Sequence, residues 1–342
     1  MPRSLAEWLD YIERQHPKSI ALGLERVREV AARMGVQRPA THVITVGGTN
    51  GKGSTVAFIE AIARAAGWKV GAYTSPHLLR YNERVRIDGA EVDDASLVVA
   101  FEAVEEARGE TPLTYFEYGT LAALWLFQRS ALDLAVLEVG LGGRLDAVNL
   151  VDPDVAVITT VDLDHQDWLG AEREAIGAEK AGIARAWKPL VLGEDAPPSS
   201  VLDRAYLIGA SAIRAGCDFF FEPLPRPADD GRPDGWRWRE VGCELELPMP
   251  RLAAPAQLRN AATAIAALRA LDVAPPEPAY AQGVATAFVP GRLQEFERDG
   301  TRIVVDVAHN PQAARELANW LGVDPPAGRT HAVFAALGDK DV

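Results

Sequence analysis

Residues 42–67, HVITVGGTNGKGSTVAFIEAIARAAG, join an apolar run to a helical pattern through a short turn that is rich in glycine. The run at residues 42–46 is rich in β-branched residues, which is typical of a strand buried on both faces. Residues 55–66 have the length and composition of a helix. A buried strand that passes directly into a helix is a unit of α/β folds, so this segment restricts the chain to that class.

The same turn has the composition of a phosphate-binding loop. Its glycines, which let backbone N–H groups turn inward, are Gly47, Gly48, Gly51 and Gly53. The helix amino terminus adds its dipole, and Lys52 adds a charge for the β and γ phosphates. The strict G-x-x-x-x-G-K-[ST] pattern is not met, because Val46 replaces its first glycine and Gly53 separates Lys52 from Ser54. The loop predicts a nucleotide site, and a glycine-rich connection without a ligand stays open as the alternative.

Between residues 41 and 193, apolar strand patterns alternate with helical ones, which indicates a parallel sheet covered by helices. The strand candidates are HVITV, KVGAYT, LAVLEV, VAVIT and PLVLG. The helix candidates are residues 55–66, 94–108, 118–128 and 172–184. We therefore expect an α/β fold, with a P-loop parallel sheet and flanking helices.

The rest of the chain predicts a small antiparallel sheet and a second domain. Residues 217–248 contain alternating tryptophans and a CELELP run, which favour antiparallel hairpins. A helix follows in AQLRNAATAIAALRAL, and beyond residue 288 come two strands around an Asp-Gly turn, a helix in PQAARELANWL and a strand in HAVFAAL. We expect a first domain at residues 1–288 and a Rossmann-like domain at residues 289–342. This second domain is small, so we expect it to be incomplete.

Composition excludes several classes of partner. The formal net charge of -13 argues against nucleic-acid and anionic-membrane binding, because such surfaces are held by clustered Lys and Arg. No apolar run reaches the roughly 20 residues that span a bilayer, and the amino terminus lacks the apolar core of a signal peptide. Only Cys217 and Cys243 occur, which we expect to be buried thiols, although a single bridge stays open. The chain is predicted to be cytoplasmic.

Polar residues follow two of the expected strands. Glu138 ends the run LDLAVLEV, where a carboxylate could hold Mg²⁺ beside a nucleotide or only cap the next helix. The run VAVITTV ends at Asp162, Asp164, His165 and Asp167. Because Mg²⁺ prefers oxygen, a histidine in such a loop is by default a hydrogen-bonding residue. Lys180, in a short helix, is by default a solvated charge.

Eight strings occur in the order GTNGKGS, TSPHLLRYNERVRIDG, LTYFEYGTLAAL, LEVGLGGRLDAVN, LDHQDWLG, EKAGI, PGRLQEF and DVAHNP. Together they resemble the dihydrofolate synthase/folylpolyglutamate synthase family, which belongs with the amide-forming Mur ligases. The resemblance runs over nearly the whole chain and is densest from residue 42 to 183.

The resemblance implies two cofactors, ATP and Mg²⁺ at two sites. It implies an ATP site at Gly48, Thr49, Asn50, Gly51, Lys52, Gly53 and Ser54, with contacts from Asn260, Arg292, Asp306 and His309. It implies metal ligands at Ser75, Glu138, His165 and Lys180, with Lys180 N6-carboxylated by CO₂ so that a cation becomes an anion. Lys52, His165 and Lys180 are the residues implied in catalysis.

A pterin site is implied at Leu22, Phe116, Asp146 and Ala147. An aromatic ring can stack on a flat pterin, although core packing is the equal alternative for Phe116.

The resemblance also implies the reaction. ATP would activate the carboxylate of dihydropteroate or of a reduced folate as an acyl phosphate, which the amine of L-glutamate attacks. The expected partners are dihydropteroate, tetrahydrofolate and L-glutamate, and family members suggest a monomer. Two alternatives remain, a Mur ligase acting on a cell-wall nucleotide precursor and a truncated ATP-binding fragment without catalysis. Whether both synthase activities are present stays open.

Overall fold

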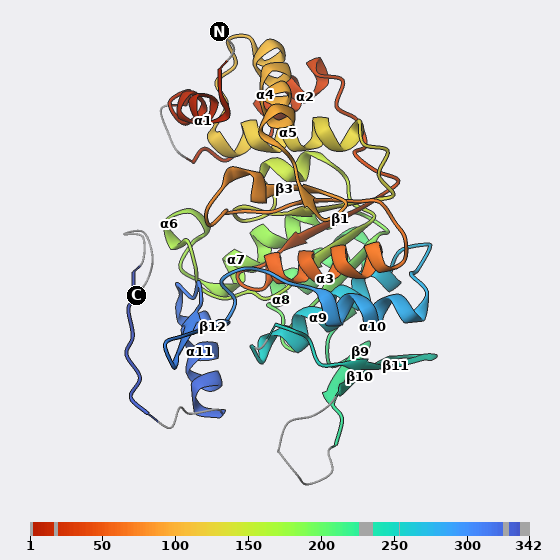
Figure 1. The fold of residues 1–342 in the computed structure, drawn as a ribbon. Coiled ribbons are helices and arrows are strands. Elements are labelled where there is room, and N and C mark those ends of the chain that lie inside the picture. Colours follow the sequence, from red (N-terminus) through yellow and green to blue (C-terminus); the bar gives the residue numbers. More distant parts are fainter. Residues whose placement is uncertain (1–2, 17–19, 226–234, 253, 324–327, 336–342) are drawn as a thin grey trace.

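The computed structural model describes residues 3–16, 20–225, 235–252, 254–323 and 328–335. An eight-stranded sheet forms its centre, in the order β4-β3-β2-β5-β1-β6-β7-β8 (Figure 1). The strands are β1 His42–Gly47, β2 Val70–Tyr73, β3 Val85–Ile87, β4 Ala90–Glu91, β5 Leu134–Glu138, β6 Val155–Ile158, β7 Pro189–Leu192 and β8 Ser211–Arg214. The expected parallel strands are confirmed, and β3 and β4 add an antiparallel edge that was not predicted.

Strand β1 lies between β5 and β6 and is parallel to both. The residues of the two partner strands, β5 and β6, are buried and almost all apolar, as strands covered on both faces should be. The chain leaves β1 toward β2 on one side and later returns to β6 on the other. Ligands of open α/β sheets bind at the carboxyl ends of strands where the order reverses in this way. The predicted site residues should therefore meet beside the end of β1.

One face of the sheet is covered by helices from the first 210 residues. They are α1 Leu5–Glu13, α2 Glu25–Arg33, α4 Asp94–Arg108, α5 Tyr115–Gln128, α7 Arg173–Lys180 and α8 Ser199–Ile208, with short turns η2 Ala147–Leu150 and η3 Ala181–Ile183. Helix α5 begins three residues before its predicted start. Thr114 caps it, since its hydroxyl accepts from Glu117 N at 3.3 Å and the Glu117 carboxylate accepts from Thr114 N at 2.8 Å.

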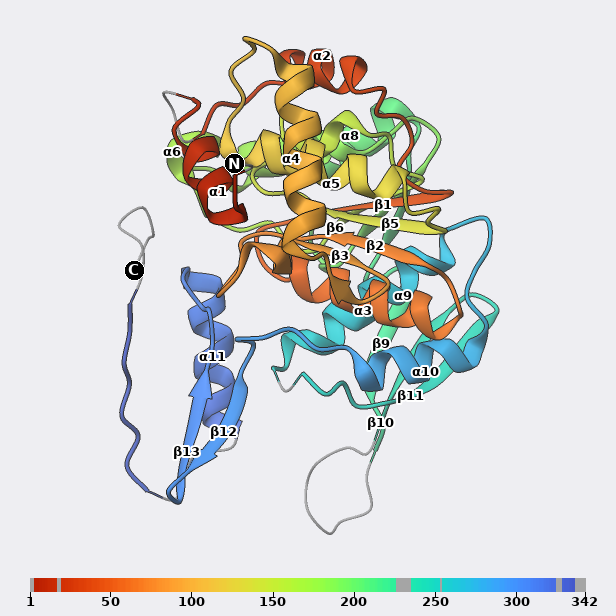
Figure 2. The same cartoon turned by 45° about the horizontal axis from the view of Figure 1, so that its top comes forward.

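The opposite face carries α3 Lys52–Ala65, α9 Ala256–Arg269 and α10 Glu277–Thr286 (Figure 2). Below them lies the predicted small antiparallel sheet, β9 Phe219–Pro223, β10 Gly235–Glu240 and β11 Cys243–Pro248. Its buried Trp236 and Trp238 pack against this second core, and Trp238 Nε1 donates to Ala262 O at 3.2 Å. No helix among the described residues is long and apolar enough to cross a membrane.

The carboxyl-terminal part is a hairpin and a helix. Strands β12 Gln294–Arg298 and β13 Thr301–Val305 pair around the predicted Asp-Gly turn, and α11 Pro311–Val323 follows. The strand predicted in HAVFAAL is wrong for residues 331–335, which are exposed and form no strand; its last two residues lie outside the described part of the chain.

Three further expectations need correction. Cys217 and Cys243 are free, as one alternative held, but Cys217 is exposed and Cys243 only half-buried. Cys217 lies in the turn between β8 and β9, and Cys243 is the first residue of β11 at the edge of the small sheet. The helix predicted over residues 172–184 ends at Lys180 and continues as the tighter turn η3. Lys180 itself is buried, with 4% of its surface exposed, which contradicts its default interpretation as a solvated charge.

Candidate active site

The glycine-rich loop, residues 48–51, connects β1 to α3 at the carboxyl edge of the sheet. Gly48 and Gly51 have φ angles of 142° and 86°, which favour glycine. A Cβ at Gly48 would overlap the hydroxyl of Thr159, and one at Gly51 would lie 2.5 Å from Asn260 Oδ1. Asn260, a predicted nucleotide contact, therefore packs directly on the loop. Both positions exclude larger residues by close approach as well as by backbone conformation.

The start of α3 presents unpaired backbone donors. Its first backbone hydrogen bond runs from Thr55 N to Gly51 O at 2.9 Å. Among the described residues, nothing accepts a hydrogen bond from the N–H groups of residues 51–54. These groups and the helix dipole form the kind of site that binds a phosphate. The loop is held in place by Thr49, whose N–H donates to Thr160 O at 2.7 Å and whose hydroxyl donates to Asp162 O at 3.0 Å.

Two lysines meet on one carbonyl of this loop. Lys52 Nζ and Lys180 Nζ each donate to Gly48 O at 3.0 Å, and Lys52 also donates to Thr49 O at 3.0 Å. Burial, and after it the neighbouring charge of Lys52, lowers the pKa of Lys180 to about 7. Burial also lowers the pKa of Lys52, against the opposing effect of Glu138 and Asp164. The structure thus brings together two lysines that are 128 residues apart in sequence.

Glu138 ends β5 directly beside this loop. It is 4% exposed, and its Oε2 accepts a hydrogen bond from Ser75 N at 3.0 Å. Burial raises its pKa, whereas Lys52, the Ser75 N–H, Arg292 and Arg86 act in the opposite direction. Both carboxylate oxygens lie 3.7 Å from where a Cβ on Gly53 would stand. The predicted metal ligands Ser75 and Glu138 are therefore neighbours, at the first turn of α3.

The segment after β6 contributes a second carboxylate. His165, at φ 50°, precedes the short helix α6 Gln166–Leu169, and its N–H donates to Asp164 Oδ1 at 2.9 Å. Asp164 acts electrostatically on both Lys52 and Lys180, so its carboxylate faces the same space. Asp164 was seen in the sequence as an acid after a strand but was not chosen as a site residue. Its position one residue before His165 is the signal that could have selected it.

The carboxyl-terminal part reaches the loop through polar side chains. Asn50 Nδ2 donates to Asn310 Oδ1 at 3.1 Å and to Gln312 Oε1 at 2.5 Å. Asn310 Nδ2 in turn donates to Asn50 Oδ1 at 2.9 Å and to Asp164 Oδ2 at 3.2 Å. Arg315 pairs with Asp162 at 2.9 Å. Neither Asn310 nor Gln312 was predicted, and for Gln312 the sequence offered no signal.

The carboxyl-terminal part also carries three predicted nucleotide contacts, Arg292, Asp306 and His309. Burial lowers the pKa of Arg292, and the charges of Asp306 and Glu138 oppose that shift, so the guanidinium faces the site. Asp306 Oδ2 accepts from Leu293 N at 2.8 Å, which fixes the turn before β12. His309 Nδ1 lies 2.7 Å from Val307 O. The roles of all three toward a nucleotide stay predictions.

The residues predicted for a pterin lie on the other side of Glu138. Phe116, in the first turn of α5, is half-buried, and a Cβ on Gly140 would touch its ring at 2.7 Å. Asp146 is 3% exposed and accepts from Leu141 N at 2.8 Å and Val148 N at 3.0 Å. Burial raises the pKa of Asp146 to about 7. Its neighbour Ala147 is buried, and Leu22 is half-buried in the segment before α2.

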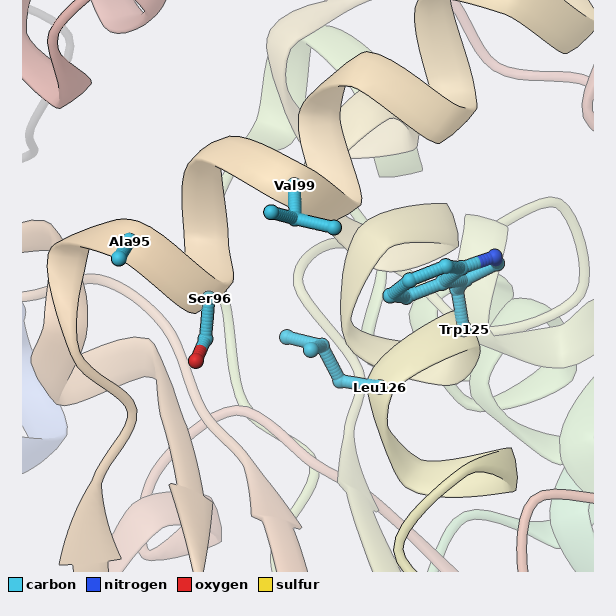
Figure 3. Close-up of a pocket in the computed structure, with 5 residues that line it drawn as sticks. All are labelled: Ala95, Ser96, Val99, Trp125 and Leu126. Carbon is cyan, nitrogen blue, oxygen red and sulfur yellow. The ribbon is translucent and has the colours of Figure 1, made fainter.

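A shallow pocket of about 260 Å³ lies elsewhere, between α4 and α5. Figure 3 shows its lining residues, Ala95, Ser96, Val99, Trp125 and Leu126. None of them is a predicted site residue, and their only polar side-chain groups are the hydroxyl of Ser96 and the indole N–H of Trp125, neither of which is an acid or a base at neutral pH. Within the described residues, no three His, Cys, Asp or Glu side chains form a group that could hold a metal. The predicted ligands instead combine one carboxylate and one histidine with Ser75 and Lys180.

Comparison with known proteins agrees with this geometry. Residues 46–213 match the Mur ligase middle domain, and residues 291–342 match the Mur ligase glutamate ligase domain. A dihydrofolate synthase/folylpolyglutamate synthase of Escherichia coli is 50% identical over 339 residues, covering 99% of this chain and 77% of that protein. The structure of E. coli FolC in complex with DHPP and ADP superposes with a TM-score of 0.93 at 49% identity, covering 99% of this chain and 79% of that one.

A bifunctional folylpolyglutamate synthase/dihydrofolate synthase with Mn, AMPPNP and L-glutamate bound has a TM-score of 0.85 at 48% identity, and the match covers 94% of this chain and 75% of that one. The fold and the loop therefore define an ATP-dependent ligase of the Mur ligase class, as predicted. Within that class, the chain belongs to the dihydrofolate synthase/folylpolyglutamate synthase family. The relatives favour this family over the cell-wall alternative.

Proposed function

We propose that this chain joins L-glutamate both to dihydropteroate and to reduced folates such as tetrahydrofolate, using ATP. The observation that carries the proposal is that the free N–H groups of residues 51–54, Lys52, Lys180 and Glu138 all lie at the glycine-rich loop and the first turn of α3. The family relatives support the same reaction class, since their names include both synthase activities.

The chemistry requires activation of a carboxylate. A carboxylate resists amide formation because its oxyanion leaves poorly, whereas an acyl phosphate releases phosphate when an amine attacks. Lys52 and the N–H groups of residues 51–54 would hold the β and γ phosphates and neutralise charge during the transfer. The second domain would close over the nucleotide and exclude water from the acyl phosphate. No covalent enzyme nucleophile is needed.

The residues present fit a hard divalent cation. Glu138 Oε2 is engaged by Ser75 N, while its Oε1 accepts no hydrogen bond from the described residues and stands beside the first turn of α3. We propose that Ser75, Glu138 and His165 hold Mg²⁺, with Lys180 as an N6-carboxylated ligand at a second site. Such a cation supplies charge stabilisation to phosphate and carboxylate oxygens. The low pKa of Lys180 leaves a fraction of it as the free amine that reacts with CO₂.

The remaining assignments complete the proposal. Gly48 to Ser54 would cradle ATP, with Asn260, Arg292, Asp306 and His309 around the nucleotide. Leu22, Phe116, Asp146 and Ala147 would line the pterin site. We propose residues 1–288 as the ATP- and pterin-binding domain and residues 289–342 as part of the glutamate-ligase domain, in a cytoplasmic monomer.

ADP release tests the proposal. The protein would be incubated with ATP, Mg²⁺ and either dihydropteroate or tetrahydrofolate, each with and without L-glutamate. Glutamate-dependent ADP release with both substrates is the expected result. Release with only one of them would restrict the chain to a single synthase activity. Absence of release with both would favour the alternative of an ATP-binding fragment without catalysis.

A further inference from the structure

Arg26, in the first turn of α2, connects three parts of the chain. Its Nε donates to Glu117 Oε2 at 2.9 Å, and its Nη2 lies 2.8 Å from Glu117 Oε1, which accepts no hydrogen bond among the described residues. The two groups therefore form an ion pair with a single hydrogen bond. Its Nη2 also donates to the carbonyl of Ala21. The Glu117 side chain is only 5% exposed and that of Arg26 25%, so the pair is largely shielded from water. Such a pair is far more directional than an exposed one.

The elements that Arg26 connects carry the residues assigned to the pterin. Ala21 directly precedes Leu22, and Glu117 directly follows Phe116. Glu117 also closes the capping box of α5, with Thr114 Oγ1 donating to its Oε2 at 2.9 Å. Helix α2 packs against the turn η2, which begins at Ala147 and is capped by Asp146. One guanidinium therefore ties the segment before α2 to the start of α5, the two places that carry Leu22 and Phe116.

Arg26 has no part in the nucleotide loop. Among the described residues its hydrogen-bond partners are Glu117 and Ala21, whereas Lys52, Lys180, Glu138 and Asp164 form a separate cluster at the glycine-rich loop. Loss of the Arg26 pair should thus loosen one half of the substrate site and leave the other in place. A substitution of Arg26 can therefore change substrate binding without changing the nucleotide loop.

We propose that Arg26 is a positioning residue for the pterin end of the substrate, which acts by holding the Leu22 segment against the first turn of α5. The inference rests on the proposed function, because it requires a pterin between these elements. Both dihydropteroate and tetrahydrofolate carry a pterin, so both should depend on Arg26 to a similar degree. The affinity for ATP should not depend on it.

The test compares Arg26→Gln with Arg28→Gln, which removes an exposed arginine from the same helix. We expect Arg26→Gln to raise KM for dihydropteroate and for tetrahydrofolate about tenfold or more, with KM for ATP and kcat at saturation within about twofold of the parent. Arg28→Gln should match the parent in all four constants. Arg26→Lys, which keeps the charge but loses the Nε donor of the planar guanidinium, should fall between the two.

Calorimetric binding of dihydropteroate in the presence of ADP provides a readout that does not need turnover. Weaker binding to Arg26→Gln than to Arg28→Gln supports the proposal even if the parent proves inactive, which would overturn only the proposed function. Unchanged dihydropteroate affinity in Arg26→Gln, or an equal loss for ATP and dihydropteroate, overturns the positioning role. Should Arg26→Gln fail to fold, Glu117→Gln keeps the shape of the carboxylate and must show the same loss restricted to the pterin substrates.

Discussion

The two sides of the nucleotide site are built by different means. On the β1 side, Gly48 and Gly51 stand so close to Thr159 and Asn260 that no side chain would fit, and the strands beneath are fully buried. On the carboxyl-terminal side, α11 approaches the same loop through amide and ion-pair contacts such as Asn50 with Asn310. The hairpin behind α11 is largely exposed, including Phe296 at 48%.

The two kinds of contact imply different rigidity for the two sides of the site. Close packing around β1 resists displacement, because any shift would open voids or create overlaps. Polar contacts can be exchanged for water at small net cost. We therefore expect the loop to keep its shape and the polar contacts of the carboxyl-terminal part to break more easily than the packing around β1.

The largest expected effect tests the rigid side. Lys52→Ala removes the charge that we assign to the phosphates, so glutamate-dependent ADP release should fall by about a thousandfold or more. The thermal unfolding curve should stay close to that of the parent, because the lysine makes only two hydrogen bonds to carbonyls. Lys69→Ala, at an exposed position beyond the far end of α3, is the matched control. Near-normal turnover by Lys52→Ala would refute the phosphate assignment.

A second substitution tests the carboxylate of the same side. Glu138→Gln keeps the shape of the side chain but removes the charge that a divalent cation needs, and turnover should drop about a hundredfold. Excess chelator should stop the parent enzyme as well. Glu91→Gln, on the exposed edge strand β4, should behave like the parent. Activity that persists in chelator would remove Glu138 and His165 from a metal site.

The pH dependence of the stability tests the burial of Lys180 on the β1 side of the site. Lys180 has a pKa of about 7 when folded, against an ordinary value of 10.5. Between these values the unfolded chain binds more protons, so stability rises with pH from about 7 to about 10. The gain is lost again as the pH falls over the same range down to the folded pKa, and below about 7 this group adds no pH dependence. Relative to Lys180→Met, the parent should gain on the order of a few kcal/mol over that range.

Urea unfolding in buffers depleted of CO₂ measures this gain, since carboxylation would change the titrating group. Lys188→Met, at an exposed surface position, gives the reference for a lysine outside the site. A parent-to-Lys180→Met difference that stays flat across the range would contradict the burial of a free amine at this position.

The smallest expected effect comes from a substitution in the carboxyl-terminal part, on the other side of the site. Asn310→Ala removes the amide that joins Asn50 and Asp164, each contact contributing roughly 1 kcal/mol. KM for ATP should rise a few-fold, with the unfolding curve little changed. Glu297→Ala, on the exposed hairpin, should leave KM for ATP as it is. If Asn310→Ala instead unfolded the protein, the polar interface would be part of the core and the contrast between the two sides would fail.

The sequence predicted the rigid side well and the rest less completely. Apolar runs and glycine punctuation located β1, β5, β6 and the loop, because burial on both faces leaves a strong pattern. The resemblance selected Lys180, which periodicity alone placed in solvent, since burial of a lysine depends on neighbours distant in sequence. The partners of Asn50 were not foreseen for the same reason, as Asn310 and Gln312 lie 260 and 262 residues away.

The carbonyl shared by Lys52 and Lys180 affects selectivity. The ammonium group of Lys52 already rests on the neutral carbonyl oxygens of Gly48 and Thr49, so an arriving anion displaces dipoles and not a full hydration shell. We expect the same arrangement to bind small inorganic anions. Sulfate and phosphate in a buffer should therefore compete with nucleotide for this loop, and apparent affinities will vary with the choice of salt.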